Sequence, residues 1–150
     1  MANFSIREIE RADLPNINLW HNDRRLSSFL GGNFHFAGSE VDESWFDRYL
    51  NDRSASVRCA IVQHDAEGIG DQVIGVVYLM DIDYVNRTGV LHIMIGNDGQ
   101  RGKGAGTFAV NAMVAHAFND LNLRRIELEV WKPMKGQLAC MKSAALLRRG

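Results

Sequence analysis

Short apolar runs, separated by polar or glycine-containing stretches, dominate the chain up to residue 95. They lie at residues 4–9, 57–62, 73–80 and 90–95, and their lengths are typical of β-strands. The run at 73–80 is hydrophobic enough for the centre of a sheet. In the run at 90–95, one set of alternating positions holds Leu91, Ile93 and Ile95, and the other holds Val90, His92 and Met94. This alternation predicts a strand that is buried on both faces.

Two helices are predicted between the first two of these strands. Asp13 precedes Leu14 and Pro15, an order typical of an N-cap followed by a proline early in a helix, and this helix extends through Trp20. A second helix begins near residue 39. Its apolar positions recur every four residues, with two more beside them: Val41, Trp45, Tyr49, Phe46 and Leu50. We expect three aromatic side chains to pack the helices: Trp20, Trp45 and Phe46.

A strand, a helix and a second strand follow one another after residue 90. The helix covers about 106–122, with apolar positions at spacings of four, three and four: Val110, Val114, Ala117 and Leu121. Residues 125–131 alternate strictly between apolar and polar, which predicts a strand with one solvated face. Short connections make this a crossover unit, so strands 90–95 and 125–131 should be parallel. The expected fold class is α/β.

Composition narrows the class of protein. The 150 residues are 46% hydrophobic, which supplies one core, so we expect a single domain over 1–150. Lys+Arg 17 against Asp+Glu 18 leaves no basic field for nucleic acid or an anionic membrane. Cys59 and Cys140 make neither a disulfide framework nor a metal cluster. No stretch approaches the roughly 20 apolar residues that cross a bilayer. We expect a soluble, unprocessed cytoplasmic protein without a metal.

The segment richest in candidate chemistry is GQRGKGAGT at residues 99–107, between a predicted strand and a helix. Glycines at alternating positions let backbone N–H groups converge, and the helix N-terminus adds further N–H groups. Arg101 and Lys103 add two positive charges, which suits a pyrophosphate. The glycines alone would equally fit a plain connecting turn. The spacing matches neither the GxGxxG nor the GxxxxGK[ST] pattern of nucleotide-binding loops.

The Arg-x-x-Gly-x-Gly order from Arg101 to Gly106 is similar to the acetyl-CoA loop of the GNAT superfamily of N-acetyltransferases. Residues 73–83, 91–96 and 122–131 also resemble the branch that contains spermidine and ribosomal-protein N-terminal acetyltransferases. The resemblance covers roughly residues 4–131. It implies a mixed, mostly antiparallel sheet, splayed where strands 90–95 and 125–131 meet. It also implies acetyl transfer from acetyl-CoA, as cosubstrate, to a primary amine by direct attack.

The same resemblance implies a set of cofactor-binding residues. The pantetheine arm would pair with the backbone of Ile93, Met94 and Ile95 as an additional strand would. The pyrophosphate would bind at the glycine loop, whose members are Arg101, Gly102, Lys103, Gly104, Ala105, Gly106 and Thr107. The acceptor stays open between a polyamine, a protein N-terminus, an amino sugar and an aminoglycoside.

Catalytic residues are less clearly marked. Many relatives place a glutamate on the strand that here includes residues 89–92, and this chain has none there. His92 is our candidate base, ahead of Asp81 and Asp83, because imidazole titrates near neutrality. A sheet histidine without a chemical role is the alternative. Asp83 and Tyr84 are candidates for binding a cationic acceptor, although Asp-Ile-Asp equally fits a turn. Cys59, in an apolar run, is expected in the core rather than as a nucleophile.

The tail at 132–150 departs from the family pattern. It holds no acid and five bases: Lys132, Lys135, Lys142, Arg148 and Arg149. The tyrosine that commonly protonates the thiolate would align with Met141. One back-translation from Pro133, regrouped after its first two bases, reads DERAISLYEKCGFVTEG, which matches the family motif. We therefore interpret the tail as the product of a frameshift near Lys132-Pro133.

Three consequences of this tail are expected. Residues 137–147 should form a short helix, since they are rich in good helix formers. The last strands of the family should be missing, which leaves the strand at 125–131 with an unpaired edge and favours a homodimer. The missing acid leaves a catalytically deficient acyl-CoA-binding module as the alternative function. A nucleotide-binding regulatory domain that uses the same loop is a third.

Overall fold

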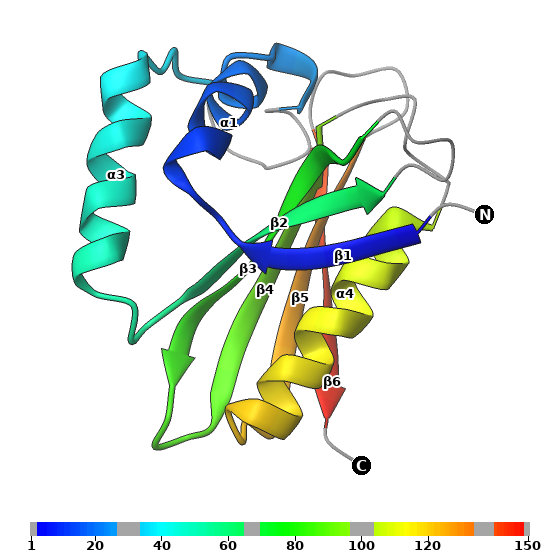
Figure 1. Cartoon of the computed structure of the whole chain (residues 1–150). Coiled ribbons are helices and arrows are strands. Elements are labelled where there is room, and N and C mark those ends of the chain that lie inside the picture. Colours follow the sequence, from blue (N-terminus) through cyan, green and yellow to red (C-terminus); the bar gives the residue numbers. More distant parts are fainter. Residues whose placement is uncertain (1–2, 27–33, 65–69, 97–103, 134–139, 149–150) are drawn as a thin grey trace.

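The computed structural model describes residues 3–26, 34–64, 70–96, 104–133 and 140–148, with the side chains of 129–145 left outside the description. Its elements, in chain order, are β1 (Asn3–Glu8), the 3-10 turn η1 (Arg11–Asp13), α1 (Leu14–His21), α3 (Ser39–Asn51), β2 (Val57–His64), β3 (Gln72–Asp83), β4 (Thr88–Ile95), α4 (Ala105–Ala115), the π turn η3 (His116–Asp120), β5 (Arg125–Pro133) and β6 (Cys140–Arg148). The strands form one six-stranded sheet in the order β1-β2-β3-β4-β5-β6 (Figure 1).

The sheet is mixed and mostly antiparallel. Every neighbouring pair is antiparallel except β4 and β5, which are parallel. The parallel pair is joined through α4, as the crossover prediction from the sequence requires. The expected fold class is therefore confirmed. Leu91 and Met94, on opposite faces of β4, are both buried, which confirms the prediction of a strand covered on both sides.

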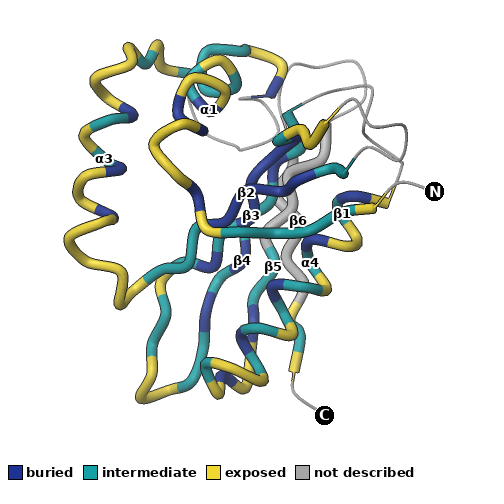
Figure 2. The backbone as a smooth tube through the Cα atoms, in the orientation of Figure 1, coloured by how far each residue is buried: buried dark blue, intermediate teal, exposed yellow. Residues whose placement is uncertain are grey.

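Helices lie over the two faces of the sheet (Figure 2). Each face has its own hydrophobic core. On one face, Val77, Leu79 and Leu91 pack with the buried side of α4. On the other, Val76 and Met94 pack with α1 and α3. Alternation along the strands produces this division, because successive side chains point to opposite faces. The face under α1 and α3 is where the candidate site lies.

The buried stripe of α3 differs from the predicted one. Phe46 and Tyr49 are buried as expected, but Val41 and Leu50 are 55% and 47% exposed. Asp42 takes a buried position instead and is 1% exposed. The helix is therefore rotated relative to the orientation predicted from the sequence. Asn18 and His21 of α1 form hydrogen bonds to the Asp42 carboxylate, and these bonds offset the free-energy cost of burying its charge.

The tail corrects two sequence-based expectations. Residues 140–148 form strand β6, antiparallel to β5, with pairs from Arg125 opposite Arg148 to Pro133 opposite Cys140. The expected helix at 137–147 is therefore wrong, and so is the unpaired edge on β5. Helix propensity differs by only about 0.7 kcal/mol per residue among ordinary residues, whereas an open strand edge presents a full row of unpaired backbone groups. The argument for a homodimer from that edge no longer holds.

Candidate active site

The β4–β5 ladder ends partway along both strands. Its pairs run from Thr88 opposite Arg125 to Leu91 opposite Leu128, while β4 continues to Ile95. On its other side, β4 stays paired with β3, with Val77 opposite Ile93 and Val76 opposite Met94. The β5 ladder therefore does not extend along the second half of β4. This is the splay expected from the sequence, and an extended ligand could add there as a strand does.

Helix α4 begins beside this half of β4. Gly104 is its N-cap residue and has φ +88°, a left-handed conformation that favours glycine. The first α-helical bond runs from the Phe108 N–H to the Gly104 carbonyl at 2.9 Å. The N–H groups of Ala105, Gly106 and Thr107 therefore make no intrahelical hydrogen bond. A Cβ on Gly106 would lie 3.8 Å from Ile93 Cδ1, so the protein's own packing leaves room for a side chain there.

A small cavity opens on the α1/α3 face of the sheet. It measures about 50 Å³ and is lined by His21, Val76, Tyr78, His92, Ile93 and Met94. Tyr78 and His92 are direct cross-strand partners on β3 and β4. A water site needs about 10–15 Å³ on the same measure, so the cavity admits a small polar group. His92, the base expected from the sequence, therefore borders a cavity, and a second imidazole borders it too.

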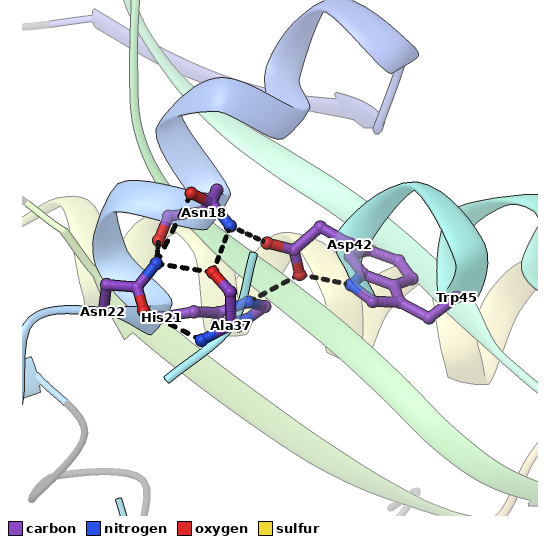
Figure 3. Close-up of polar contacts among 6 residues, drawn as sticks. All are labelled: Asn18, His21, Asn22, Ala37, Asp42 and Trp45. Carbon is purple, nitrogen blue, oxygen red and sulfur yellow. Dashed lines mark hydrogen bonds and ion pairs between the residues drawn. The ribbon is translucent and has the colours of Figure 1, made fainter. Parts of the chain in front are cut away.

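That second imidazole, His21 on α1, is held by a buried carboxylate (Figure 3). His21 Nδ1 donates to Asp42 Oδ1 at 2.7 Å. Trp45 Nε1 donates to the same oxygen at 2.6 Å, and Asn18 Nδ2 donates to Asp42 Oδ2 at 2.8 Å. Asn22 Nδ2, like Asn18 Nδ2, also donates to the Ala37 carbonyl. The network ties α1 to α3 and fixes the ring of His21.

Tyr78 supplies a neutral phenol to the same cavity. Burial raises the pKa of Tyr78 to about 12, although the positive charge of Arg58 acts in the opposite direction. The Arg58 guanidinium carbon lies 4.8 Å from the centroid of the Tyr78 ring and 4.9 Å from that of Trp45. Within the described residues, the proton of the buried Tyr78 hydroxyl has no acceptor. A hydroxyl in this state can donate to a ligand oxygen or sulfur.

Other residues singled out from the sequence lie elsewhere. The Asp83 carboxylate accepts hydrogen bonds from the backbone of Val85 and Asn86, so it stabilises the β3–β4 turn. Asp83 is opposite Thr88, at the far end of β4 from His92, and neither it nor Tyr84 lines the cavity. Asp81, at φ +52°, belongs to the irregular stretch of β3 before that turn. Arg101, Gly102 and Lys103 lie outside the described residues.

Cys59 is confirmed as a core residue. It is 8% exposed on β2, and burial, followed by the nearby negative charge of Glu8, raises the pKa of its thiol to about 11. Such a thiol stays protonated and unreactive at neutral pH. Among the described residues, no group of three or more His, Cys, Asp or Glu side chains could hold a metal ion. No helix in the described ranges is long and apolar enough to span a membrane.

Comparison with known proteins gives a consistent result. The model of the acetyltransferase (GNAT) domain matches residues 3–144. A spermidine N(1)-acetyltransferase of Vibrio cholerae serotype O1 is 28% identical over 129 residues, which cover 86% of this chain and 70% of that protein.

Solved structures agree. The crystal structure of spermidine N-acetyltransferase from Vibrio cholerae in complex with CoA and spermine superposes with a TM-score of 0.74 at 26% identity, covering 85% of this chain and 71% of that one. A Phe-to-Gly mutant of the Vibrio cholerae enzyme superposes with a TM-score of 0.70 over 97% of this chain and 93% of that one. Its identity of 21% makes it evidence for the fold alone.

Proposed function

This chain belongs to the acetyltransferase (GNAT) domain family, and from that premise we propose that its acceptor is a polyamine such as spermidine. The protein is an acetyl-CoA-dependent N-acetyltransferase, which transfers an acetyl group to an amine. Support for a polyamine comes from the relatives, one named as a spermidine N(1)-acetyltransferase and one solved with CoA and spermine. The charge of the chain agrees, since residues 1–131 hold 18 Asp+Glu against 12 Lys+Arg. An acidic body attracts a polycation.

For acetyl-CoA we propose the residues expected from the sequence. The pantetheine arm would run along the backbone of Ile93, Met94 and Ile95, and the pyrophosphate would bind from Arg101 to Thr107. The end of the β4–β5 ladder at Leu91 supports the first part. The unused N–H groups at the start of α4 and the left-handed Gly104 support the second. Acetyl-CoA supplies the thioester, whose acetyl carbon is the electrophile.

The cavity supports acetyl transfer chemistry at the reacting end of that arm. An ammonium group must lose a proton before its nitrogen can attack, and the leaving thiolate must gain one. His92 and His21 each carry an imidazole, a proton acceptor, and the Tyr78 phenol can donate a hydrogen bond. Because these groups line a site already shaped by the sheet and α1, they offer orientation as well as proton transfer.

The observation that carries this proposal is the coincidence of the cavity with the open half of β4, since Ile93 and Met94 belong to both. The test is a thiol-release assay with acetyl-CoA and a panel of amines: spermidine, spermine, a peptide with a free N-terminus, an amino sugar and an aminoglycoside. We expect the highest kcat/KM with a polyamine. A higher kcat/KM with the peptide or an aminosugar-containing acceptor would contradict the polyamine assignment.

Location and assembly stay proposals as well. We propose a cytoplasmic enzyme, because the chain has only two cysteines, too few for a disulfide framework. The homodimer stays a prediction. The unpaired β5 edge no longer supports it, because β6 pairs with β5. Light scattering of the purified protein at several concentrations decides it.

A further inference from the structure

We propose that His21, held by Asp42, is the base that takes the proton from the acceptor amine. The proposal rests on the acetyl transfer proposed for this site, but it does not depend on which amine is the acceptor. A base from another element is needed because the strand at 89–92 contains no glutamate. His21 is not within that strand, and its role follows from its place in the cavity and from its hydrogen bond.

The hydrogen bond selects the tautomer of His21. Asp42 Oδ1 also accepts from Trp45 Nε1, which can only donate, and Asp42 Oδ2 accepts from Asn18. A carboxylate in this setting acts as an acceptor toward His21, so the neutral ring carries its proton on Nδ1. Nε2 is then left with a lone pair, and the ring can take up a proton there. The carboxylate stabilises the imidazolium that forms.

His92 lacks such a partner. It lines the same cavity, but its ring makes no side-chain hydrogen bond within the described ranges, so its tautomer is not fixed. The titratable groups that face His21 are Asp42 from α3, Tyr78 from β3 and His92 from β4. Of these, Asp42 alone is within hydrogen-bond distance of the ring. The geometry therefore prepares one of the two imidazoles for proton uptake.

Packing fixes the distance of α1 from β4. Trp20, the residue before His21, lies so close to Gly96 that a Cβ there would come 2.0 Å from Trp20 Cε2. Gly96 follows directly after β4, and its N–H donates to the Ile74 carbonyl on β3 at 2.8 Å. The indole is thus packed on the backbone at the end of the strand. This contact holds His21 against the half of β4 proposed to bind the thioester.

The proposed step balances in atoms and charge. His21 Nε2 takes one proton from the ammonium, and the resulting amine attacks the acetyl carbon. As the C–N bond forms and the C–S bond breaks, the sulfur receives the C–S electron pair. The nitrogen then loses a second proton, which ends on the sulfur to give the thiol. The His21 imidazolium returns its proton to water. One proton is released to solvent for each amide formed.

The kinetic test compares the two histidines that line the cavity with a third histidine outside it, which is paired with an aspartate as His21 is. His116 and Asp120 form an exposed pair with the same 2.7 Å distance as His21 and Asp42, but they do not line the cavity. We expect His21→Gln to lower kcat about 100-fold or more, with the Kd for acetyl-CoA within threefold of the parent. His92→Gln should lower kcat less than tenfold, and His116→Gln should leave it unchanged. Added imidazole should restore part of the activity of His21→Ala.

Two further outcomes separate a base from a structural residue. Asp42→Asn, which keeps the size of the side chain, should lower kcat and change the pH dependence of kcat/KM, whereas Asp120→Asn should change neither. A kcat for His21→Gln within threefold of the parent would overturn the proposal. So would a larger loss of kcat in His92→Gln than in His21→Gln.

A measurement without substrate keeps the proposal testable whatever the acceptor is. Nitrogen-15 NMR of the histidine side chains reports which ring nitrogen carries the proton. For His21 we expect the proton on Nδ1 at neutral pH, and a shift toward the Nε2–H form in Asp42→Asn. A parent protein with the proton of neutral His21 on Nε2 would overturn the assignment. A failure to acetylate spermidine would contradict the proposed acceptor and leave this result unaffected.

Discussion

Gly104 shows how one residue links the backbone to cofactor binding. Its φ of +88° is a conformation that costs a non-glycine residue about 1–2 kcal/mol, yet a Cβ there would meet no atom within 4 Å. Steric crowding by the protein therefore does not explain the glycine. The conformation does, because the left-handed N-cap residue turns the chain into α4, whose first N–H groups make no intrahelical hydrogen bond.

Gly104→Val should strain this turn and obstruct the N–H groups, so we expect acetyl-CoA binding to weaken at least tenfold. Gly70→Val is the matched control, because Gly70 has φ +105° and equally open surroundings but lies far from α4 in the sequence, before β3. Calorimetric titration with acetyl-CoA measures both variants. Equal affinities in the two variants would remove the glycine loop from the binding site.

Arg101 was identified from the sequence as a charged partner of the pyrophosphate. Arg101→Ala should weaken acetyl-CoA binding by about 1–3 kcal/mol through lost charge-assisted hydrogen bonds. Arg48→Ala on α3, where the guanidinium bonds only to Ser44 among the described side chains, is the control and should leave the affinity unchanged. An unchanged affinity in Arg101→Ala would contradict the assignment.

Residue identity alone did not reveal the His21 and Asp42 pair. The two lie on different helices, and their pairing depends on how α1 and α3 pack, which spacing along one chain segment does not encode. A signal was present, since Asn18, His21 and Asn22 place three polar side chains three and four residues apart at the end of the first predicted helix. Asp42 gives no such signal, because an acidic residue in the first turn of a helix is common whatever it contacts.

At the scale of elements, α1 depends on two contacts at its ends. At its C-terminal end, Trp20 packs on Gly96. Gly96→Ala would place a Cβ 2.0 Å from the indole, so the helix or the strand must move. We expect a loss of about 1–3 kcal/mol in the free energy of unfolding and a lower kcat, because His21 moves with Trp20.

Gly38→Ala is the control for this change, because a Cβ there would meet no atom within 4 Å. Thermal unfolding measures the stability of both variants, and steady-state kinetics measure their kcat. A Gly96→Ala enzyme with the stability and kcat of Gly38→Ala would show that the Trp20 contact does not position α1.

At the N-terminal end of α1, Asp13 joins β1 to the helix. Burial alone would raise the pKa of the Asp13 carboxyl, but hydrogen bonds from Arg7 and from the Glu10 backbone outweigh it and hold the pKa below its usual range. The ionised form is therefore favoured in the folded state, and its contribution to stability is present above the ordinary carboxyl pKa. That contribution is lost as the pH falls through the lowered pKa of the folded state.

Asp13→Asn should therefore lower the free energy of unfolding by about 1–3 kcal/mol at pH 7, and this deficit should shrink in acid as the parent loses the same charge. Urea unfolding between pH 7 and pH 2 measures it. Glu40→Gln, an exposed change on α3, should stay within about 0.5 kcal/mol of the parent. A deficit that grows toward acid would have the wrong sign for this account.

Elements were predicted well where periodicity was strong and local. Strands β1 to β5 lie within a few residues of their predicted positions, because alternation follows directly from burial on a sheet. The helix predicted at about 106–122 is α4 over Ala105–Ala115, followed by the π turn η3 to Asp120. The stripe of α3 and the strand β6 were not predicted. In both, a partner distant in sequence decides the outcome: α1 binds Asp42, and the β5 edge pairs residues 140–148.

At the scale of the whole molecule, the frameshift hypothesis makes its own prediction. The regrouped reading restores a tyrosine near the position of Met141, which would provide an acid for the thiolate. A chain with the restored frame should show a higher kcat than the 150-residue chain at similar affinity for acetyl-CoA. Equal kcat values, or a gene whose codons around position 132 do not permit the regrouping, would contradict it.

The central proposal is that the protein transfers the acetyl group of acetyl-CoA, bound along β4 and at the start of α4, to a polyamine bound on the α1/α3 face. The most direct measurement mixes the purified protein, acetyl-CoA and equimolar spermidine, N-terminal peptide and aminoglycoside, and follows the mass of each acceptor with time. We predict that spermidine gains one acetyl group first and that no acceptor gains mass when acetyl-CoA is omitted. Earlier acetylation of the peptide or the aminoglycoside, or binding of acetyl-CoA without acetylation of spermidine, would contradict the account.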